Sequence, residues 1–379
     1  MTEENKMTAF GTSVGADEKQ SSINSNSTLT DYDSFGNDEF ENVYANWEEI
    51  CDPNRLNTVT MAELYETAYP PRSPIIENLL YPGTYLFAGA PKVGKSFLVA
   101  QIGYHVSAGI PLWNLPVRQG RVLYLALEDD YARLQGRLSR MFGVEGNPYF
   151  HFTIDAHRMA DGLDQQLENF IRKHPDTRLI IIDTLQKIRE IGDEKYSYSS
   201  DYDIIGKLKG FSERFGICIL LVHHTRKQDA KDRMDMISGT TGLLGAADGA
   251  FLLHKENRTS NNAALEIVGR DQQDQRLQLN FDREQCTWGL TGIETDLWKA
   301  PSDPLLEEIA KILSPETPVW QGSPSMLAEL INTDLQPNVL SRKLNVNVGR
   351  LYNEYGIRYS YNRCHEGRKI KLWLESASA

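Results

Sequence analysis

The stretch Gly89-Ala90-Pro91-Lys92-Val93-Gly94-Lys95-Ser96 fits the phosphate-loop spacing G-x-x-x-x-G-K-[ST] without a mismatch. An apolar run at residues 85–88 predicts a strand before it, and residues 97–102 begin a predicted helix after it. Backbone N–H groups of such a loop and the positive end of its helix attract phosphates. The stretch therefore predicts a bound nucleoside triphosphate, with Lys95 on the β- and γ-phosphates and Ser96 on Mg²⁺. The alternative is a glycine turn without a ligand.

The length of 379 residues allows two or three domains. The four cysteines, Cys51, Cys218, Cys286 and Cys364, form no C-x-x-C pair and no zinc spacing, which favours reduced thiols in a cytoplasmic protein. The N-terminus has no basic start followed by an apolar stretch, and no run of about 18 apolar residues occurs. We therefore expect neither secretion nor a membrane span.

The net charge of −12 is unevenly distributed, because the N-terminal end of the chain is acidic and the C-terminal end is basic. Residues 1–50 hold eleven Asp and Glu against two Lys, a net of −9, whereas residues 340–379 hold eight Lys and Arg against three Glu, a net of +5. Residues 1–55 show no apolar period, so we predict a disordered acidic tail. The aromatic residues Phe35, Phe40, Tyr44 and Trp47 leave open a short helix that binds a partner.

Residues 56–300 read as an α/β domain. Apolar runs at residues 85–88, 122–127, 179–182 and 217–222 predict parallel strands covered on both faces, with helical patterns between them. This alternation predicts a mostly parallel sheet. After Gly239, three segments with polar alternation, 250–254, 265–269 and 277–281, predict an antiparallel extension at its edge.

Residues 303–376 predict a separate small domain. Helices are expected at residues 305–313, 325–331 and 338–355, and residues 357–374 alternate around a turn at Glu366-Gly367. Three helices and a hairpin indicate a winged helix-turn-helix. Its basic residues predict phosphate contacts, while the alternative is a protein-docking domain with Trp320, Tyr352, Tyr355 and Tyr361 in its core. The basic residues are Arg342, Lys343, Arg350, Arg358, Arg363, Arg368, Lys369 and Lys371.

Two carboxylates follow predicted strands, at the edge of a parallel sheet where ligands bind. Asp183 ends the run 179–182 in the pattern of a Mg²⁺ aspartate. Glu128 ends the run 122–127 and heads an acidic cluster that could otherwise cap the next helix. We predict Glu128 as the general base that activates water and Asp130 as the cap.

The pair His223-His224 closes the fourth apolar run. We predict that His224 contacts the γ-phosphate and reports its hydrolysis, although one of the pair could be a buried structural histidine. The following residues 226–241 contain Arg226, Lys227, Lys231 and Arg233. The composition of this segment alone would indicate a mobile solvated loop. Its position directly after His224, the residue predicted to report hydrolysis, favours a loop that contacts DNA.

Four motifs together resemble the RepA family of hexameric replicative helicases, within the RecA-like ATPases. They are residues 89–96, Leu125-Ala126-Leu127-Glu128-Asp129, Ile182-Asp183-Thr184-Leu185 and His223-His224-Thr225-Arg226-Lys227. The resemblance covers residues 60–290 and continues through residues 238–242, 246–248 and 269–271. It implies ATP hydrolysis between neighbouring subunits of a ring around single-stranded DNA. It also implies that Glu128 is the catalytic glutamate and Arg270 a candidate arginine finger.

The acidic tail and the C-terminal domain lie outside this resemblance. Our leading interpretation is a DNA-dependent ATPase with ATP and Mg²⁺ as cofactors, forming a homo-oligomer, expected to be a hexamer, that acts as a helicase of a plasmid, phage or integrated element. The alternative is a nucleotide-switched regulator or loader that unwinds nothing. Arg270 could instead be a surface residue paired with Asp271 or Asp274, and Arg258 or Lys255 could supply the finger.

Overall fold

The computed structural model describes residues 56, 58–189, 197–225, 242–255, 257, 259–270, 272–295, 301–364 and 367–375. The chain separates into two compact units, Met1–Met61 and Ala62–Ala379, and nearly all described residues belong to the second. The predicted acidic tail, residues 1–55, and the predicted DNA-contacting loop, residues 226–241, lie outside the described residues.

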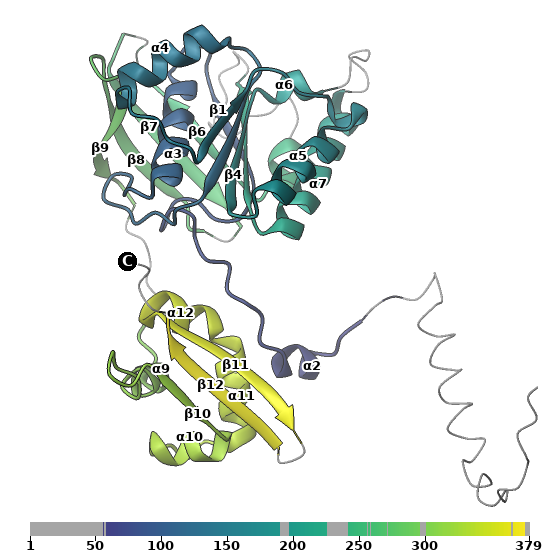
Figure 1. Cartoon of the computed structure of the whole chain (residues 1–379), viewed down its shortest axis with the longest axis vertical. Helices are drawn as coiled ribbons and strands as arrows, with labels where there is room; N and C mark the ends of the chain where they lie inside the picture. The colour runs from purple at the N-terminus through teal and green to yellow at the C-terminus, as the bar shows by residue number, and fades with distance from the viewer. Residues whose placement is uncertain are drawn as a thin grey trace, which may run out of the picture. The chain divides into compact units, whose positions relative to one another are not determined.

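The described elements are shown in Figure 1. In chain order they are α2 (Met61–Glu66), β1 (Gly83–Gly89), α3 (Lys95–Ala108), β2 (Arg121–Ala126), α4 (Tyr131–Phe142), β3 (Phe150–Thr153), the 3-10 helix η1 (Met159–Asp161), α5 (Leu163–Lys173), β4 (Thr177–Asp183), α6 (Leu185–Ile188), α7 (Ser197–Phe215), β5 (Cys218–His224), α8 (Gly242–Ala246), β6 (Gly249–His254), β7 (Asn262–Gly269), β8 (Gln275–Asp282), β9 (Thr287–Ile293), α9 (Pro304–Ala310), β10 (Val319–Gly322), α10 (Pro324–Leu330), α11 (Pro337–Val346), α12 (Val348–Tyr355), β11 (Ile357–Cys364) and β12 (Gly367–Leu374).

A nine-stranded sheet with the order β3-β2-β4-β5-β1-β6-β7-β8-β9 forms the frame of the larger domain. The six strands β1 to β6 pair in parallel, and β7, β8 and β9 extend the sheet in antiparallel order. The predicted α/β class, a mostly parallel sheet with an antiparallel edge, is confirmed. The strand before the phosphate loop, β1, lies between β5 and β6, so β5 separates it from β4.

The sequence analysis predicted that residues 250–254 belong to the antiparallel extension. This prediction was wrong. They lie in β6, which pairs in parallel with β1 from Tyr85 opposite Gly249 to Gly89 opposite Leu253. The long interval between β5 and β6 permits the crossover that a parallel pair requires, whereas β6 and β7 are close enough in sequence for an antiparallel turn. The strands β3 and β9 were not predicted.

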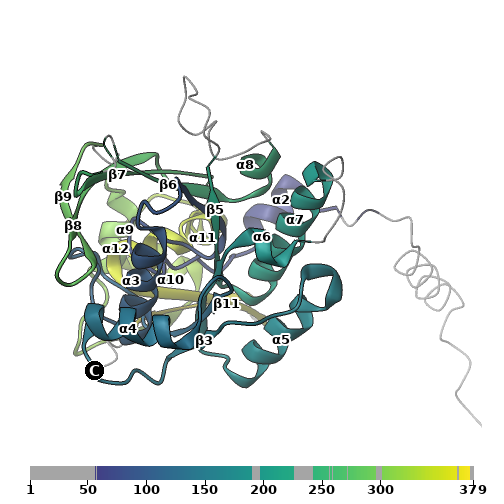
Figure 2. The same cartoon turned by 90° about the horizontal axis from the view of Figure 1, so that it is seen from above.

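Helices cover both faces of the sheet, as Figures 1 and 2 show, with α3 and α4 on one face and α5 and α7 on the other. Alternate residues of β1 divide between two apolar cores. Tyr85 and Phe87 pack with residues of α3 and α4, and Leu86 and Ala88 pack with residues of α5 and α7. Burial on both faces explains why the parallel strands read as unbroken apolar runs.

The C-terminal module, residues 301–375, has its own apolar core, which includes Leu306, Leu340, Leu351 and Ile370. Its three-stranded sheet has the order β10-β12-β11, and β11 and β12 form the predicted hairpin. The predicted helix over residues 338–355 is divided into α11 and α12, with Asn347 as the cap of both. The strand β10 was not predicted.

Candidate functional site

The phosphate loop joins β1 to α3 in the conformation its sequence predicts. Lys92 and Gly94 both have positive φ angles, 64° and 109°. A Cβ atom on Gly94 would lie 2.8 Å from Trp288 Cζ2, so glycine is needed here for space as well as for backbone conformation. The α-helix begins directly afterwards at Lys95, which places its N-terminal N–H groups at the mouth of the loop.

Trp288 of β9 ties the antiparallel extension to the helix that follows this loop. Its backbone N–H donates to Gln101 Oε1 at 2.8 Å, and Gln101 Nε2 donates to the Trp288 carbonyl at 3.0 Å. Its indole Nε1 donates to the Gly94 carbonyl at 3.3 Å. The side chain is 1% exposed. The extension therefore supports the phosphate loop, a role that the sequence analysis missed along with β9 itself.

Asp183 ends β4 and lies beside Ser96, the first residue after the loop lysine. Ser96 Oγ donates to Asp183 Oδ2 at 2.8 Å, and the hydroxyl of buried Tyr124 donates to the same oxygen at 2.9 Å. Burial raises the pKa of Asp183, and these two hydrogen bonds act in the opposite direction. Hydroxyl and carboxylate oxygens are ligands that suit Mg²⁺. The predicted metal residues are therefore adjacent, and Tyr124 is an addition that the sequence analysis missed.

Glu128 follows β2 at the same edge of the sheet. Thr184 Oγ1 donates to Glu128 Oε1 at 3.0 Å, while the carboxylate remains 45% exposed. Its other oxygen, Oε2, lies 4.0 Å from His224 Nε2. A carboxylate that is held on one side and open to solvent on the other can accept a proton from water. The predicted cap, Asp130, accepts from the backbone N–H of Arg133 at 2.8 Å.

Lys95 Nζ donates to the Gly89 carbonyl at 2.8 Å, to the Ala90 carbonyl at 3.1 Å and to His224 Nδ1 at 3.1 Å. Burial lowers the pKa of Lys95 to about 8. Burial and the neighbouring lysine also lower the pKa of His224. Because an ammonium only donates, Nδ1 must accept and the neutral ring carries its proton on Nε2, towards Glu128. His224 thus links Lys95 to the predicted base.

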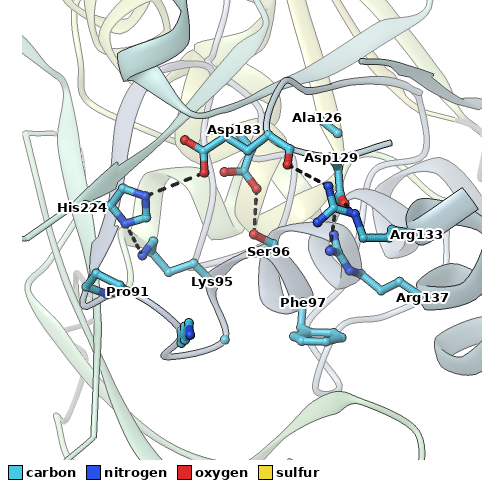
Figure 3. A pocket seen from close by; sticks show the side chains of 13 residues that line it. Pro91, Lys95, Ser96, Phe97, Ala126, Asp129, Arg133, Arg137, Asp183 and His224 are labelled. Atoms are coloured by element: carbon cyan, nitrogen blue, oxygen red, sulfur yellow. Dashed lines mark hydrogen bonds and ion pairs between the residues drawn. The ribbon is translucent and has the colours of Figure 1, made fainter. Parts of the chain in front are cut away.

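A cavity of about 610 Å³ is lined by Lys95, Ser96, Glu128, Asp183 and His224, among others. Figure 3 shows Ser96 and Asp183 in its middle, Lys95 and His224 on one side, and Arg133 and Arg137 of α4 on the other. Asp129 pairs with both arginines, at 3.2 Å and 2.7 Å. The sequence analysis missed Arg133 and Arg137 as cations in the cavity wall. Their partner, Asp129, belongs to the same acidic cluster as Glu128.

Arg270 is not brought to this cavity. It follows β7, whose last residue, Gly269, pairs with Gly249 at the end of β6 remote from the phosphate loop. Its Nη2 donates to the Gly245 carbonyl at 3.1 Å. Arg270 therefore lies away from the phosphate loop of its own chain. Lys255 instead follows the loop end of β6, with its Nζ 5.3 Å from the Trp288 ring centre.

Arg258 and Asp271, named in the alternatives for the finger, lie outside the described residues. Across the part of the chain that the structure describes, no group of three or more His, Cys, Asp or Glu side chains could hold a metal ion. A site built on Ser96 and Asp183 needs the phosphates and water to complete it. Among the described helices, none has the length and apolar character that crossing a membrane requires.

A family model described as AAA domain matches residues 30–230 of the chain. No curated protein sequence matches it significantly. Similar solved structures include one described as an ATPase domain, 16% identical with a TM-score of 0.48, which covers 69% of this chain and 100% of that one. Another is the KaiC-like protein PH0186 from the hyperthermophilic archaeon Pyrococcus horikoshii OT3, 13% identical with a TM-score of 0.42, covering 59% and 99%.

Proposed function

Because this chain belongs to the AAA domain family and carries a P-loop ATPase core, we propose that it is a DNA-dependent ATPase that works as a ring-forming helicase. The observation that carries the proposal is the meeting of Ser96, Asp183 and Glu128 in one cavity with the phosphate loop. These are the groups that phosphoryl transfer from a nucleoside triphosphate to water needs.

Each residue of the cavity takes one role in this proposal. Ser96 and Asp183 would hold Mg²⁺, which would supply positive charge against the triphosphate. Lys95 exchanges its contacts with the loop carbonyls for contacts with the phosphates. Glu128 accepts the proton of the attacking water, and His224 lies within reach of both Lys95 and Glu128. His224 can therefore respond to loss of the γ-phosphate.

The resemblance to RepA-family hexameric helicases supports a homo-oligomer, expected to be a hexamer, with single-stranded DNA in its channel. In such a ring, Arg270 reaches the γ-phosphate of a neighbouring subunit and residues 226–241 contact DNA. We place the ATPase domain at residues 56–300 and a winged helix-turn-helix at residues 303–376. The order of helices and strands in the C-terminal module supports the second assignment.

The direct test combines ATP hydrolysis with strand displacement. Wild-type protein should hydrolyse ATP faster with single-stranded DNA and should separate a forked duplex. Lys95→Ala should lose turnover and bind ATP weakly, because its ammonium is the cation that contacts the loop carbonyls and faces the phosphates. Lys173→Ala, in the last turn of α5, is a matched control that should behave as wild type.

The outcomes separate the two candidate functions. Wild-type turnover in Lys95→Ala would refute the ATP site. DNA-stimulated hydrolysis without strand displacement would instead favour the nucleotide-switched regulator or loader, in which ATP controls assembly on DNA.

A further inference from the structure

The segment that precedes the ATPase core contacts the basic surface of the C-terminal module. Glu66, the last residue of α2, lies between two arginines of that module. Its Oε1 is 2.8 Å from Arg342 Nε on α11, and its Oε2 is 2.8 Å from Arg368 Nη2 on β12. Both arginines hold the pKa of the Glu66 carboxyl below its usual value. Each carboxylate oxygen thus has its own guanidinium.

The backbone carbonyls of the same segment accept three further hydrogen bonds from the module, one of them from Arg368 Nη2 to the Glu66 carbonyl at 3.4 Å. The hydroxyl of Tyr361 donates to the Glu66 carbonyl at 2.7 Å, and Asn345 Nδ2 donates to the Tyr65 carbonyl at 2.9 Å. In these five contacts every group of the module is a donor and every group of the segment is an acceptor. A phosphodiester, which carries one negative charge on two free oxygens, also only accepts.

The module holds these donors in place by contacts of its own. The Arg368 guanidinium lies 4.2 Å from the centre of the Tyr361 ring. Asn345 is 4% exposed, and its Oδ1 accepts from the Tyr359 hydroxyl at 2.8 Å, which directs its Nδ2 towards the segment. Arg368 and Asn345 are therefore positioned by contacts within the module as well as by the segment.

The segment, in contrast, is attached with little apolar burial. No residue of α2 is buried, and Met61 and Leu64 are 67% and 43% exposed. Ala68 packs, partly buried, against the core of the module. Partly exposed ion pairs contribute little to stability because solvent screens them. A polyanion that makes several contacts at once can therefore displace the segment.

In the other arginine ion pairs of the module, the carboxylate comes from the module itself. Arg350 pairs with Glu354 of the same helix, and Arg358 pairs with Glu375, the residue that follows β12. Among the module arginines whose side chains the structure describes, Arg342 and Arg368 are paired with a carboxylate from outside residues 301–375. Glu66 can therefore leave without unfolding the module.

We propose that Arg342, Arg368, Tyr361 and Asn345 form a site for the phosphodiester backbone of DNA, which Tyr65 and Glu66 occupy when DNA is absent. The identity of the ligand rests on the proposed function, since it takes DNA as the partner. Binding of DNA replaces the Glu66 carboxylate by a phosphate and releases the segment that leads into β1.

The test measures the affinity of the full chain for labelled single-stranded and duplex DNA over a range of salt concentrations, without nucleotide. Glu66→Gln removes the competing charge and should tighten binding about threefold or more. Arg342→Gln and Arg368→Gln should weaken binding, and each should reduce the slope of log affinity against log salt by about 1. Arg342 is the more exposed of the two, 45% against 11%, so it remains informative if Arg368→Gln folds poorly.

Glu354→Gln is the matched control, because it makes the same change in net charge and releases Arg350. It should leave affinity within about twofold of wild type. Equal tightening by Glu66→Gln and Glu354→Gln would overturn the site in favour of a general charge effect, as would an unchanged slope in Arg342→Gln. If neither wild type nor Glu66→Gln binds DNA, the site and the DNA-dependent part of the proposed function both fail, whereas binding without these differences removes only the site.

Discussion

The cavity around the phosphate loop and the basic surface of the C-terminal module both gather charged side chains, but they balance the charge differently. In the cavity, Asp183 and Glu128 lie near the Lys95 ammonium, which donates to carbonyl oxygens of the loop, while the two arginines of the wall, Arg133 and Arg137, pair with a different carboxylate, Asp129. In the module, the arginines at 342, 350, 358 and 368 are each paired with a carboxylate of the chain. Hydrolysis in the cavity therefore needs a further cation, Mg²⁺ or an arginine from another subunit. Binding of DNA to the module instead needs the removal of a carboxylate that already occupies its arginines. Four changes test the cavity side of this comparison.

The largest effect is expected from Arg270. Arg270→Ala should reduce kcat by about 10³–10⁵, because an arginine finger stabilises the charge that develops on the γ-phosphate. Arg270 follows the end of β7 that is remote from the phosphate loop of its own chain, so in the proposed ring it would serve the cavity of a neighbouring subunit. Inactive Lys95→Ala subunits mixed with inactive Arg270→Ala subunits should therefore regain part of the ATPase activity, because some interfaces join an intact loop to an intact finger.

Size-exclusion chromatography is the control for this mixing experiment, because both variants must still assemble. Full ATPase activity of assembled Arg270→Ala would show that another cation serves the cavity. Lys255→Ala is the next variant to measure, since Lys255 follows the loop end of β6.

The next effect separates the two carboxylates of the cavity. Glu128→Gln should lower kcat by about 10²–10⁴ and leave Mg²⁺-dependent ATP binding nearly intact, because a positioned base contributes that range. Asp183→Asn should weaken the Mg²⁺-dependent binding as well, since Asp183 contacts Ser96 directly. Titration with ATP in the presence and absence of Mg²⁺ distinguishes them. Equal loss of binding in both variants would contradict the assignment of separate roles.

A smaller effect is expected from Tyr124, the tyrosine beside Asp183. Tyr124→Phe removes the hydroxyl that donates to Asp183 Oδ2 and should raise the Mg²⁺ concentration needed for half-maximal ATPase activity by about 10- to 100-fold. At saturating Mg²⁺ most of the kcat should return, which a purely structural defect would not show. Tyr104→Phe is the matched control, because the Tyr104 ring stacks on Phe142; it should need no more Mg²⁺ than wild type.

The sequence predicted those parts of the site whose residues have a fixed spacing or end a strand. The loop at residues 89–96 is one continuous motif, and Asp183 and Glu128 each follow a run that must be a buried strand. The carboxyl ends of parallel strands meet at one edge of the sheet, so these residues could be placed together without knowing the strand order.

The missed residues depend on strand register and on contacts between distant parts of the chain. Tyr124 lies inside an apolar run, and its contact with Asp183 requires the alignment of β2 with β4. Trp288 contacts Gln101, 187 residues earlier. Glu66 contacts Arg342, 276 residues later. A count of charges predicted the basic end of the chain, but it could not predict which carboxylates are paired with it.

The smallest effect concerns the protonation of Lys95. Because burial lowers its pKa to about 8, Lys95 loses its proton as pH rises through this value, and the charge that attracts the triphosphate is lost with it. Binding of the triphosphate favours the charged form and must therefore take up a proton above about pH 8. The affinity for a non-hydrolysable ATP analogue should fall about tenfold between about pH 7 and pH 9. Lys95→Arg keeps its charge throughout this range, so its affinity, although different from wild type, should not change. Equal pH profiles for the two proteins would show that the buried lysine is not the titrating group.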